Sequence, residues 1–214
     1  MDFTNFYDCK TKTLTLPYTF DKELKNIPKT TENIIFKQMT SKNIIQLFTG
    51  FNKKIDNLPK YFLGFPQRLI QMTFNYWFNQ KVDKLPKNLI QITFGNSFNQ
   101  YVNNLPKNLR KISFGKEYNK KTDKLPKNLI YLNFGSNFNQ NVNKLPKNLN
   151  YLIFRDNFNQ KIDNLPQNLT HIVLSEKFNE EIYNLPLTMK EIHTYRRELI
   201  RKIPYKCKVV NLYK

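Results

Sequence analysis

Residues 85–106 read LPKNLIQITFGNSFNQYVNNLP, and the chain repeats nearly the same sequence motif every twenty residues. The segment LPKNL begins at positions 85, 105, 125 and 145, and LPQNL follows at 165. Phe-Asn recurs at 78, 98, 138, 158 and 178, and Tyr118-Asn119 fills the remaining interval. A fixed short period is typical of a repeat architecture, in which each unit buries its apolar side chains against its neighbours.

Apolar positions inside the unit indicate where the chain forms a strand. In one unit they are Leu89, Ile92 and Phe94, and the units from residue 69 to residue 174 place apolar side chains at the same three positions. The alternation between Ile92 and Phe94 is typical of a strand with one buried face. The pattern L-x-x-I-x-F resembles the strand segment of a leucine-rich repeat. We therefore predict one six-residue strand per unit, which leaves too few residues for a full return helix.

Proline and asparagine mark the turns of each unit. Each Pro pushes the preceding residue toward an extended conformation and cannot donate a hydrogen bond to a sheet, so we place it on the return path before the Lys-Asn turn. The Asn of Phe-Asn forms an unbroken column: Asn52, Asn79, Asn99, Asn119, Asn139, Asn159 and Asn179. If Asn were only a turn former, Asp, Gly or Ser would be expected in some copies. We predict instead an inward ladder whose amides bond backbone groups from coil to coil.

These features predict a single domain over residues 1–214, a leucine-rich-repeat-like solenoid. A parallel β-sheet is expected on one face, with coils of 20 residues and little or no α-helix on the return side. Residues 1–10 are the predicted N-terminal cap, and residues 195–214 a C-terminal coil and cap. Between them, residues 11–194 form about ten coils with insertions at 37–50 and 60–66.

The C-terminal residues and the two cysteines allow further predictions. In the last coil Pro204, Cys207, Val210 and Leu212 are expected to continue the Pro, Leu, Ile and Phe columns, which makes Cys207 a buried structural thiol. An extended repeat holds Cys9 far from Cys207, so we expect no disulfide and favour a reducing compartment.

The recurrent F-N-x-x-I/V-x-x-L-P, as in Phe78-Asn79, Val82 and Leu85-Pro86, resembles the FNIP repeat of proteins from social amoebae and from giant DNA viruses of amoebae. The resemblance covers at least residues 51–186, and the abundance of Asn, Lys, Ile, Phe and Tyr fits an A/T-rich genome from either source. It implies a leucine-rich-repeat-like recognition scaffold. Some members carry an N-terminal F-box that connects them to a ubiquitin ligase. Periodic strands begin here by about residue 11, so we expect neither an F-box nor a ligase-adaptor role.

Motifs argue against an enzyme. The sequence has no phosphate-cradling Gly-rich loop, no Cys/His spacing for a metal and no nucleophile elbow, so we expect no catalytic residue, cofactor or metal. His171 shares a column with Glu191 and is expected about 5 Å from it on the next strand, with His193 in a neighbouring exposed column. Such a trio suits a metal or an acid–base pair, but a polar surface near the C-terminal cap explains it more simply.

The outward strand columns carry the candidate binding site, because core columns explain packing and exposed ones explain partners. Aromatic, apolar and basic side chains gather within four consecutive units: Tyr131, Tyr151, Ile153, Arg155, His171, Val173 and Tyr195. Equivalent earlier positions, such as Gln91, Thr93 and Gly115, are small or polar. Exposed Tyr and Arg beside apolar residues are typical of protein-binding surfaces. The alternative is that the exposed face of a solenoid varies without function.

The net charge of +19 has a pattern of its own. Seven lysines near successive prolines form a predicted basic ridge: Lys84, Lys87, Lys107, Lys124, Lys127, Lys144 and Lys147. Ammonium groups about 5 Å apart can follow a phosphate backbone with strong salt dependence. Faces of one charge are, however, often only solvated. The ridge also lacks the interleaved exposed aromatic residues that bind single strands.

The sequence thus predicts a non-enzymatic scaffold for protein–protein interaction that uses the exposed strand face. Electrostatic nucleic-acid binding through the basic ridge is the alternative, and a structural or virion-associated component is a third. There is no signal peptide and no apolar run of 18 residues. We therefore expect no membrane partner, a cytoplasmic location (host cytoplasm if the protein is viral) and a monomer or weak oligomer.

Overall fold

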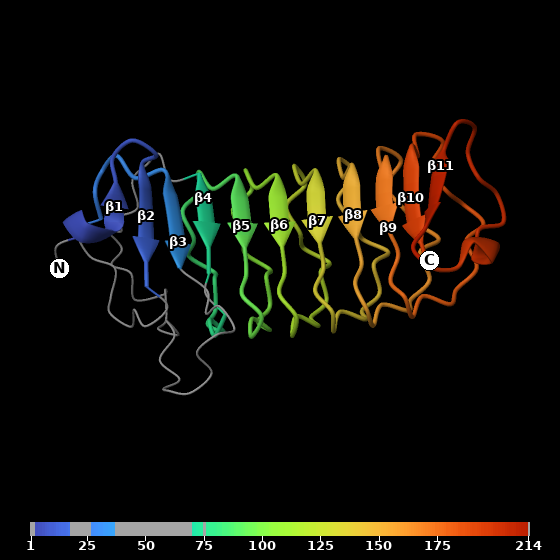
Figure 1. Cartoon of the computed structure of the whole chain (residues 1–214), viewed down its shortest axis with the longest axis horizontal. Coiled ribbons are helices and arrows are strands. Elements are labelled where there is room, and N and C mark those ends of the chain that lie inside the picture. Colours follow the sequence, from blue (N-terminus) through green and yellow to red (C-terminus); the bar gives the residue numbers. More distant parts are fainter. Residues whose placement is uncertain (1–2, 18–26, 37–69, 75, 214) are drawn as a thin grey trace.

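Strands stacked in sequence order build the described part of the molecule. The structure is a computed structural model of the 214-residue chain, and it describes residues 3–17, 27–36, 70–74 and 76–213. The strands are β1 (Tyr7–Asp8), β2 (Thr13–Leu16), β3 (Asn33–Phe36), β4 (Gln71–Thr73), β5 (Gln91–Thr93), β6 (Lys111–Ser113), β7 (Tyr131–Asn133), β8 (Tyr151–Ile153), β9 (His171–Val173), β10 (Glu191–Thr194) and β11 (Lys208–Asn211). They form one sheet in the order β1 to β11, drawn as an elongated row in Figure 1. Strand β1 is antiparallel to β2, and each later strand is parallel to the one before it.

Equal positions of successive units lie side by side in this sheet. Ile92 pairs with Ile112, and Ile112 pairs with Leu132. The same 20-residue offset joins each neighbouring pair from β4 to β10. The predicted parallel sheet with 20-residue coils is therefore confirmed. The insertions predicted at 37–50 and 60–66 lie outside the described residues.

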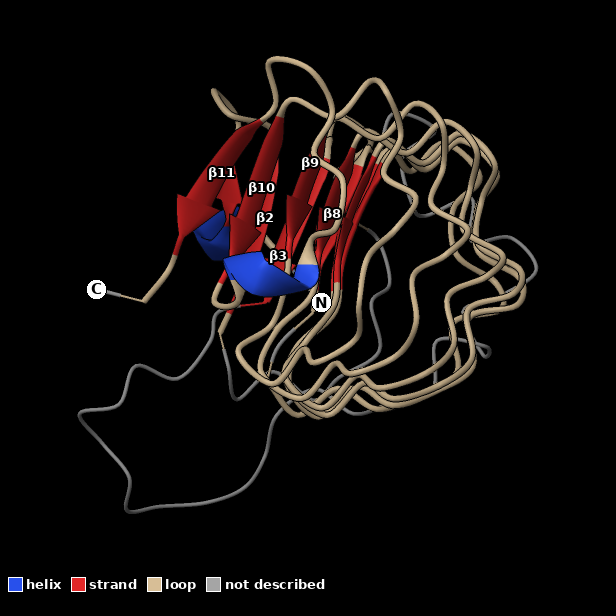
Figure 2. Ribbon diagram, turned by 90° about the vertical axis from the view of Figure 1, so that its right-hand side faces the viewer, coloured by secondary structure: helices blue, strands red, loops and turns tan. Residues whose placement is uncertain are grey.

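Each coil returns to the sheet through turns rather than a helix. Strand β5 has three residues instead of the six predicted for residues 89–94. It is short because Leu89 closes a turn, in which its N–H donates to the Pro86 carbonyl at 3.3 Å. Within the described residues, helical segments occur only near the ends, as the 3-10 turns η1 (Thr4–Phe6) and η2 (Arg197–Leu199). Figure 2 shows the sheet as one side of a coil whose other sides are loops, which confirms the prediction of little or no α-helix.

Two columns of aromatic rings fill the space between the sheet and the return path. Phe134 follows β7 and stacks on Phe138 of the same coil, with ring centroids 3.7 Å apart. Between coils, Phe134 lies 5.6 Å from Phe154, and Phe138 lies 6.0 Å from Phe158. These four side chains are at most 1% exposed. Burial of one such side chain stabilises the fold by about 1.5–3 kcal/mol, and each ring pair adds about 0.5–1.5 kcal/mol. The columns therefore join each coil to the next.

The Asn column of the Phe-Asn pairs forms a ladder along one turn. The Oδ1 of each Asn from Asn79 to Asn159 accepts the backbone N–H of the Asn one coil later, at 2.8–3.1 Å. The predicted ladder is confirmed, but its inward direction is wrong, since Asn119 and Asn139 are exposed. Successive residues of an extended segment point to opposite sides, and the preceding aromatic ring occupies the inside. Asn52 lies outside the described residues.

The last coil differs from the prediction by one residue. Val209, rather than Val210, pairs with Ile192. In the final turn the Cys207 N–H still donates to the Pro204 carbonyl, at 3.1 Å. The coil is therefore one residue shorter than predicted between that turn and β11. A slip of one residue exchanges the two faces of a strand, and Val210 and Leu212 leave the predicted core columns. Cys207 is half-buried against the core rather than buried, and it is a free thiol, as is the exposed Cys9.

Candidate partner-binding surface

The outward side chains of β7 to β10 form one continuous surface. In one row, Tyr131, Tyr151 and His171 occupy paired positions on neighbouring strands. In the next row, Ile153 pairs with Val173. The residue between the two rows is buried in each of β7, β8 and β9, so the alternation of the strand turns both rows outward. The structure thus places five of the seven predicted residues next to one another.

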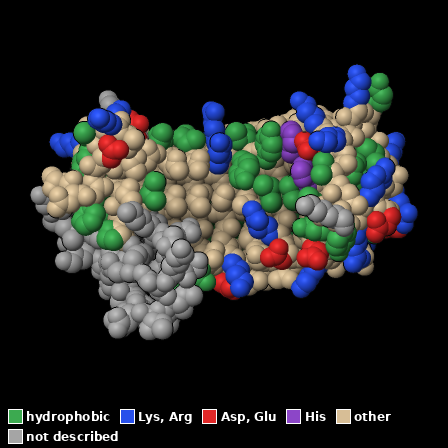
Figure 3. Space-filling view, viewed as in Figure 1, with side chains coloured by type: hydrophobic (Ala, Val, Ile, Leu, Met, Phe, Trp, Pro, Cys, Tyr) green, Lys and Arg blue, Asp and Glu red, His purple; other side chains and the backbone are tan. Residues whose placement is uncertain are grey.

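Contacts between aromatic rings hold the side chains of the first row (Tyr131, Tyr151 and His171) in place. Tyr151 stacks on His171 with centroids 4.3 Å apart and planes 10° apart, and Tyr131 lies 6.3 Å from Tyr151. Tyr151 remains 43% exposed, so a large part of an ordered aromatic side chain faces outward. Figure 3 shows apolar and aromatic side chains gathered beside the two histidines on this face. An exposed tyrosine held in place by its neighbours loses little side-chain entropy on binding, which suits a protein contact.

Arg155 and Tyr195 lie just past the ends of β8 and β10. Arg155 follows the buried Phe154 and is exposed. Tyr195 is half-buried and meets Tyr213 edge-on, with ring centroids 5.2 Å apart. These two side chains therefore border the surface formed by the two rows, and Arg155 adds a cation to that border.

The same face is polar over β4 to β6. Its outward residues there are Gln71, Thr73, Gln91, Thr93, Lys111 and Ser113. Figure 3 shows few hydrophobic side chains over that part of the sheet. Core packing constrains the inward residues alone, so the change from polar to aromatic residues along the outward face is not required by the fold. This contrast distinguishes β7 to β10 as the candidate site.

The predicted His-Glu-His cluster lies at the C-terminal border of the surface. His193 Nε2 is 2.8 Å from Glu191 Oε1, and Lys208 Nζ is 3.8 Å from the same oxygen. The hydrogen bond with His193 and, to a lesser extent, the charge of Lys208 lower the pKa of the Glu191 carboxyl group. His171 instead places Nδ1 2.8 Å from Thr170 Oγ1. Within the described ranges, no three His, Cys, Asp or Glu side chains are grouped closely enough to hold a metal ion.

The basic ridge lies on the edge from which the chain enters the strands. Lys87, Lys107, Lys127 and Lys147 occupy the same position of successive turns that close on the Pro carbonyl, and all four are exposed. The other exposed ridge lysines belong to the turn before each Pro: Lys84, Lys124 and Lys144. One aspartate of that turn partly neutralises the ridge, since Lys144 Nζ lies 3.6 Å from Asp123 Oδ2.

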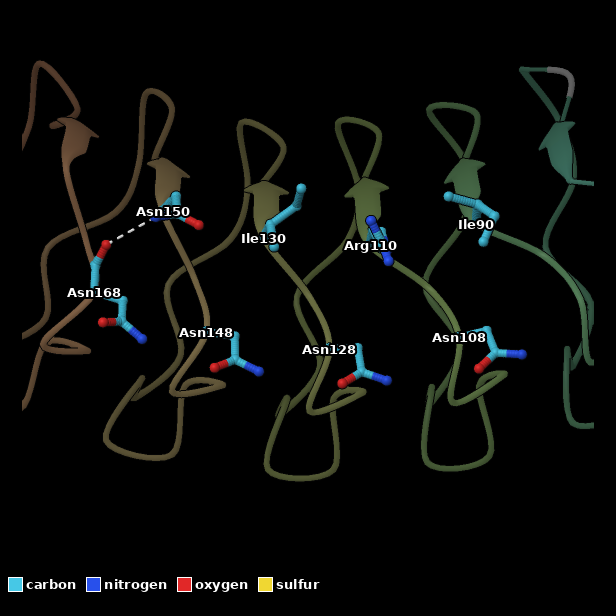
Figure 4. A pocket seen from close by; sticks show the side chains of 8 residues that line it. All are labelled: Ile90, Asn108, Arg110, Asn128, Ile130, Asn148, Asn150 and Asn168. Carbon is cyan, nitrogen blue, oxygen red and sulfur yellow. Dashed lines mark hydrogen bonds between the residues drawn. The ribbon is translucent and has the colours of Figure 1, made fainter.

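A second asparagine ladder lines a groove beside the ridge. The Asn of each LPKN or LPQN turn donates from Nδ2 to the carbonyl of a turn Lys one coil earlier, at 3.2 Å: Asn108, Asn128, Asn148 and Asn168. Figure 4 shows these amides in one row, with Ile90, Arg110, Ile130 and Asn150 in a second row. The recurring Asn is visible in the sequence, but a turn alone accounts for it, so sequence reasoning missed this ladder.

Comparison with known proteins classifies the repeat. The FNIP repeat family matches residues 78–117, 118–157 and 141–177. Residues 78–177 are FNIP repeats. These FNIP repeats include β5 to β9, and with them Tyr131, Tyr151 and most of the candidate surface. A search of curated proteins finds no significant match.

A solved structure shares the fold of this chain. CroV588, a novel circular leucine-rich-repeat protein of a giant virus, is 30% identical to it, with a TM-score of 0.54. The match covers 87% of this chain and 32% of that one, so this chain spans about a third of the length of CroV588. The fold is therefore leucine-rich-repeat-like, a class made up mainly of non-catalytic scaffolds. Over the described residues, the structure has no helix with the length and apolar character needed to cross a membrane.

Proposed function

We propose that this FNIP-repeat protein is a non-enzymatic cytoplasmic scaffold that binds another protein through the outward face of β7 to β10. The observation that carries the proposal is the pair of adjoining rows, one of stacked rings around Tyr151 and one formed by Ile153 and Val173. Solenoids of this class present extended surfaces to protein partners, which supports the same assignment.

The charged border gives the proposed contact its orientation. Arg155 lies on one side of the aromatic row, and the Glu191 carboxylate lies at its C-terminal end. Charges at the rim of an interface mainly select the partner and steer its approach, whereas central aromatic residues supply most of the affinity. We therefore assign the larger share of binding to Tyr151 and the selection of the partner to Arg155 and Glu191.

The experiment is a quantitative pull-down from cytoplasm of the source cell, with and without nuclease. The test variant is Tyr151→Ala with Arg155→Ala, and the control is Gln91→Ala with Thr93→Ala, which changes the polar part of the same face. A partner of the proposed surface should lose at least about tenfold in affinity for the test variant, because hot-spot truncations exceed 1.4 kcal/mol. The control should retain it. Equal recovery with the test variant and the unchanged protein would rule out this face.

Nucleic-acid binding through the basic ridge is the second candidate, because four of its lysines repeat at one turn position and are exposed. An electrostatic contact should weaken steeply with salt and be reduced by Lys107→Glu with Lys127→Glu. DNA binding that does not change between low and physiological salt would contradict an electrostatic origin, and no binding at low salt would exclude this function. Recovery of the chain in purified particles would instead favour a virion-associated role.

A further inference from the structure

The turn column that carries the basic ridge changes character at its C-terminal end. The residue after the Pro of each turn is, in successive coils, Lys87, Lys107, Lys127, Lys147, Gln167, Leu187 and Tyr205. Every one of these turns is closed by the same hydrogen bond, donated to the Pro carbonyl by the N–H three residues later, at 3.0–3.3 Å. These side chains therefore occupy one structural position and form a line along one edge of the solenoid.

The apolar end of this line is unusually exposed. Leu187 is 86% exposed and Tyr205 is 87% exposed, the highest values among the large apolar side chains that the structure describes. The neighbouring turn column changes in the same coil, because Tyr183 replaces the Asp that stands at residue 163, and it is 56% exposed. Core packing does not explain the apolar character of Leu187, Tyr205 and Tyr183, because all three side chains are exposed. In both turn columns, the charged or amide side chains of the earlier coils are replaced by apolar ones at the C-terminal end.

Charged side chains of both signs lie near the apolar end. Lys202 and Asp163 line the same hollow as Tyr183 and Leu187, and the Tyr183 hydroxyl donates to Glu181. Lys206 Nζ lies 5.3 Å from the centre of the Tyr205 ring. Along the rest of the edge, seven ridge lysines outnumber the three aspartates of the neighbouring column, at residues 83, 123 and 163. The edge is therefore positive over residues 84–147, carries Asp163 and Gln167 in the next coil, and ends in protruding apolar side chains beside two lysines.

We propose that this edge binds an anionic lipid surface, with the ridge lysines on the headgroups and Leu187 and Tyr205 inserted at the interface. Lysine clusters are attracted to anionic leaflets, and tyrosine, with its apolar ring and polar tip, is enriched at the membrane–water interface. An amphipathic surface needs only partial burial to bind in this way, so no spanning segment is required. The row of coils is elongated, and a plane can touch such an edge at several coils at once (Figure 1).

Other occupants explain fewer of these residues. A nucleic acid accounts for the lysines but leaves Leu187 without a role. Protein-binding hot spots lie in well-packed surroundings, whereas Leu187 and Tyr205 protrude singly from turns. The edge uses none of the residues of the strand-face surface, so a lipid contact and a protein contact can be tested separately.

The test is co-sedimentation of the full chain with vesicles of phosphatidylcholine alone or mixed with phosphatidylserine. Binding should require phosphatidylserine and weaken with added salt, since the headgroup contact is electrostatic. Leu187→Ser with Tyr205→Ser should reduce binding about tenfold, because it removes the inserted apolar groups without changing the charge. Tyr151→Ser, on the strand face, is the matched control and should bind as the unchanged protein does.

Insertion has an independent readout. A Tyr205→Trp variant should shift its fluorescence to shorter wavelength on phosphatidylserine vesicles, whereas Tyr151→Trp should not, and Trp77 gives the same background in both. Equal sedimentation with both kinds of vesicle would overturn the proposal, as would unchanged binding of the Leu187→Ser, Tyr205→Ser variant. Binding to DNA without binding to vesicles would also overturn it and assign the ridge to nucleic acid.

Discussion

Replacing Tyr118 by Phe is expected to stabilise the protein, because it removes a buried hydroxyl group that has no hydrogen-bond partner in the described part of the chain. Tyr118 is 0% exposed and stands in the column where the neighbouring coils place Phe98 and Phe138. Its ring lies 3.7 Å from that of Phe114 and 6.0–6.1 Å from those of Phe98 and Phe138. Its hydroxyl group neither donates nor accepts a hydrogen bond among the described residues. Since the Phe variant keeps every ring contact, the substitution isolates the oxygen.

The expected gain is about 1–3 kcal/mol in the free energy of unfolding, the usual cost of a buried polar group without a hydrogen bond. Chemical denaturation should show a higher midpoint at an unchanged m-value. The reverse substitution, Phe138→Tyr, should destabilise the protein by a similar amount. Tyr101→Phe is the control, since Tyr101 is 60% exposed, and it should change stability by less than about 0.5 kcal/mol.

The same burial makes a pH-dependent prediction. Desolvation raises the pKa of the Tyr118 hydroxyl group in the folded state. A raised folded-state pKa leaves stability intact below the unfolded value of about 10 and reduces it as pH rises above that value. Tyr118→Phe should therefore lose less stability than the unchanged protein in alkaline solution. A variant that is no more stable at neutral pH, and that loses stability in parallel above pH 10, would refute the placement of this hydroxyl in a dry core.

Three further substitutions test the coil contacts and the border of the candidate surface. Gly135→Ala should cost about 1–3 kcal/mol in thermal or chemical unfolding, because the added Cβ would lie 1.8 Å from a carbonyl oxygen of the preceding coil; an unchanged midpoint would contradict this contact. Asn139→Ala removes an exposed acceptor of two hydrogen bonds and should cost about 0.5–1.5 kcal/mol, against less than about 0.5 kcal/mol for Lys107→Ala; equal losses would argue against the ladder. His193→Ala should raise the pKa of Glu191 toward its ordinary value in a carboxyl NMR titration, because the carboxylate loses its hydrogen-bond donor. A lowered folded-state pKa contributes stability that is lost as pH falls through it, so the variant should also lose less stability in acid. An unchanged Glu191 titration would show that His193 does not cause the lowered pKa.

Periodicity predicts this fold well where the copies are regular. The spacing of Leu89, Ile92 and Phe94 predicts a buried strand position, and the structure pairs Ile92 with its equivalent one coil later. The strand is nevertheless half the predicted length, because the turn closed by Leu89 begins bending the chain before the sheet starts. Apolar spacing shows which side chains are buried, but it does not distinguish a strand from the turn that leads into it.

The candidate site was predictable only as a set of columns. The outward positions of Tyr131 and Tyr151 follow from the period, whereas the stacking of Tyr151 on His171 depends on coordinates. At the last coil one missing residue moves Val210 out of the column in which the pattern places it. A repeat alignment cannot locate such a deletion when Val209 and Val210 fit the apolar column equally well.

Both proposed surfaces depend on the straight columns in which equal positions of successive 20-residue coils lie. Spin-label distance measurement tests this arrangement most directly, with Cys9 and Cys207 replaced by Ser and label pairs joining position 87 to positions 147 and 187. The spacing of about 5 Å per strand predicts narrow distributions centred at about 15 Å across three coils and about 24 Å across five. Broad distributions, or distances that do not grow in proportion to the number of coils, would show that the coils are not stacked in columns.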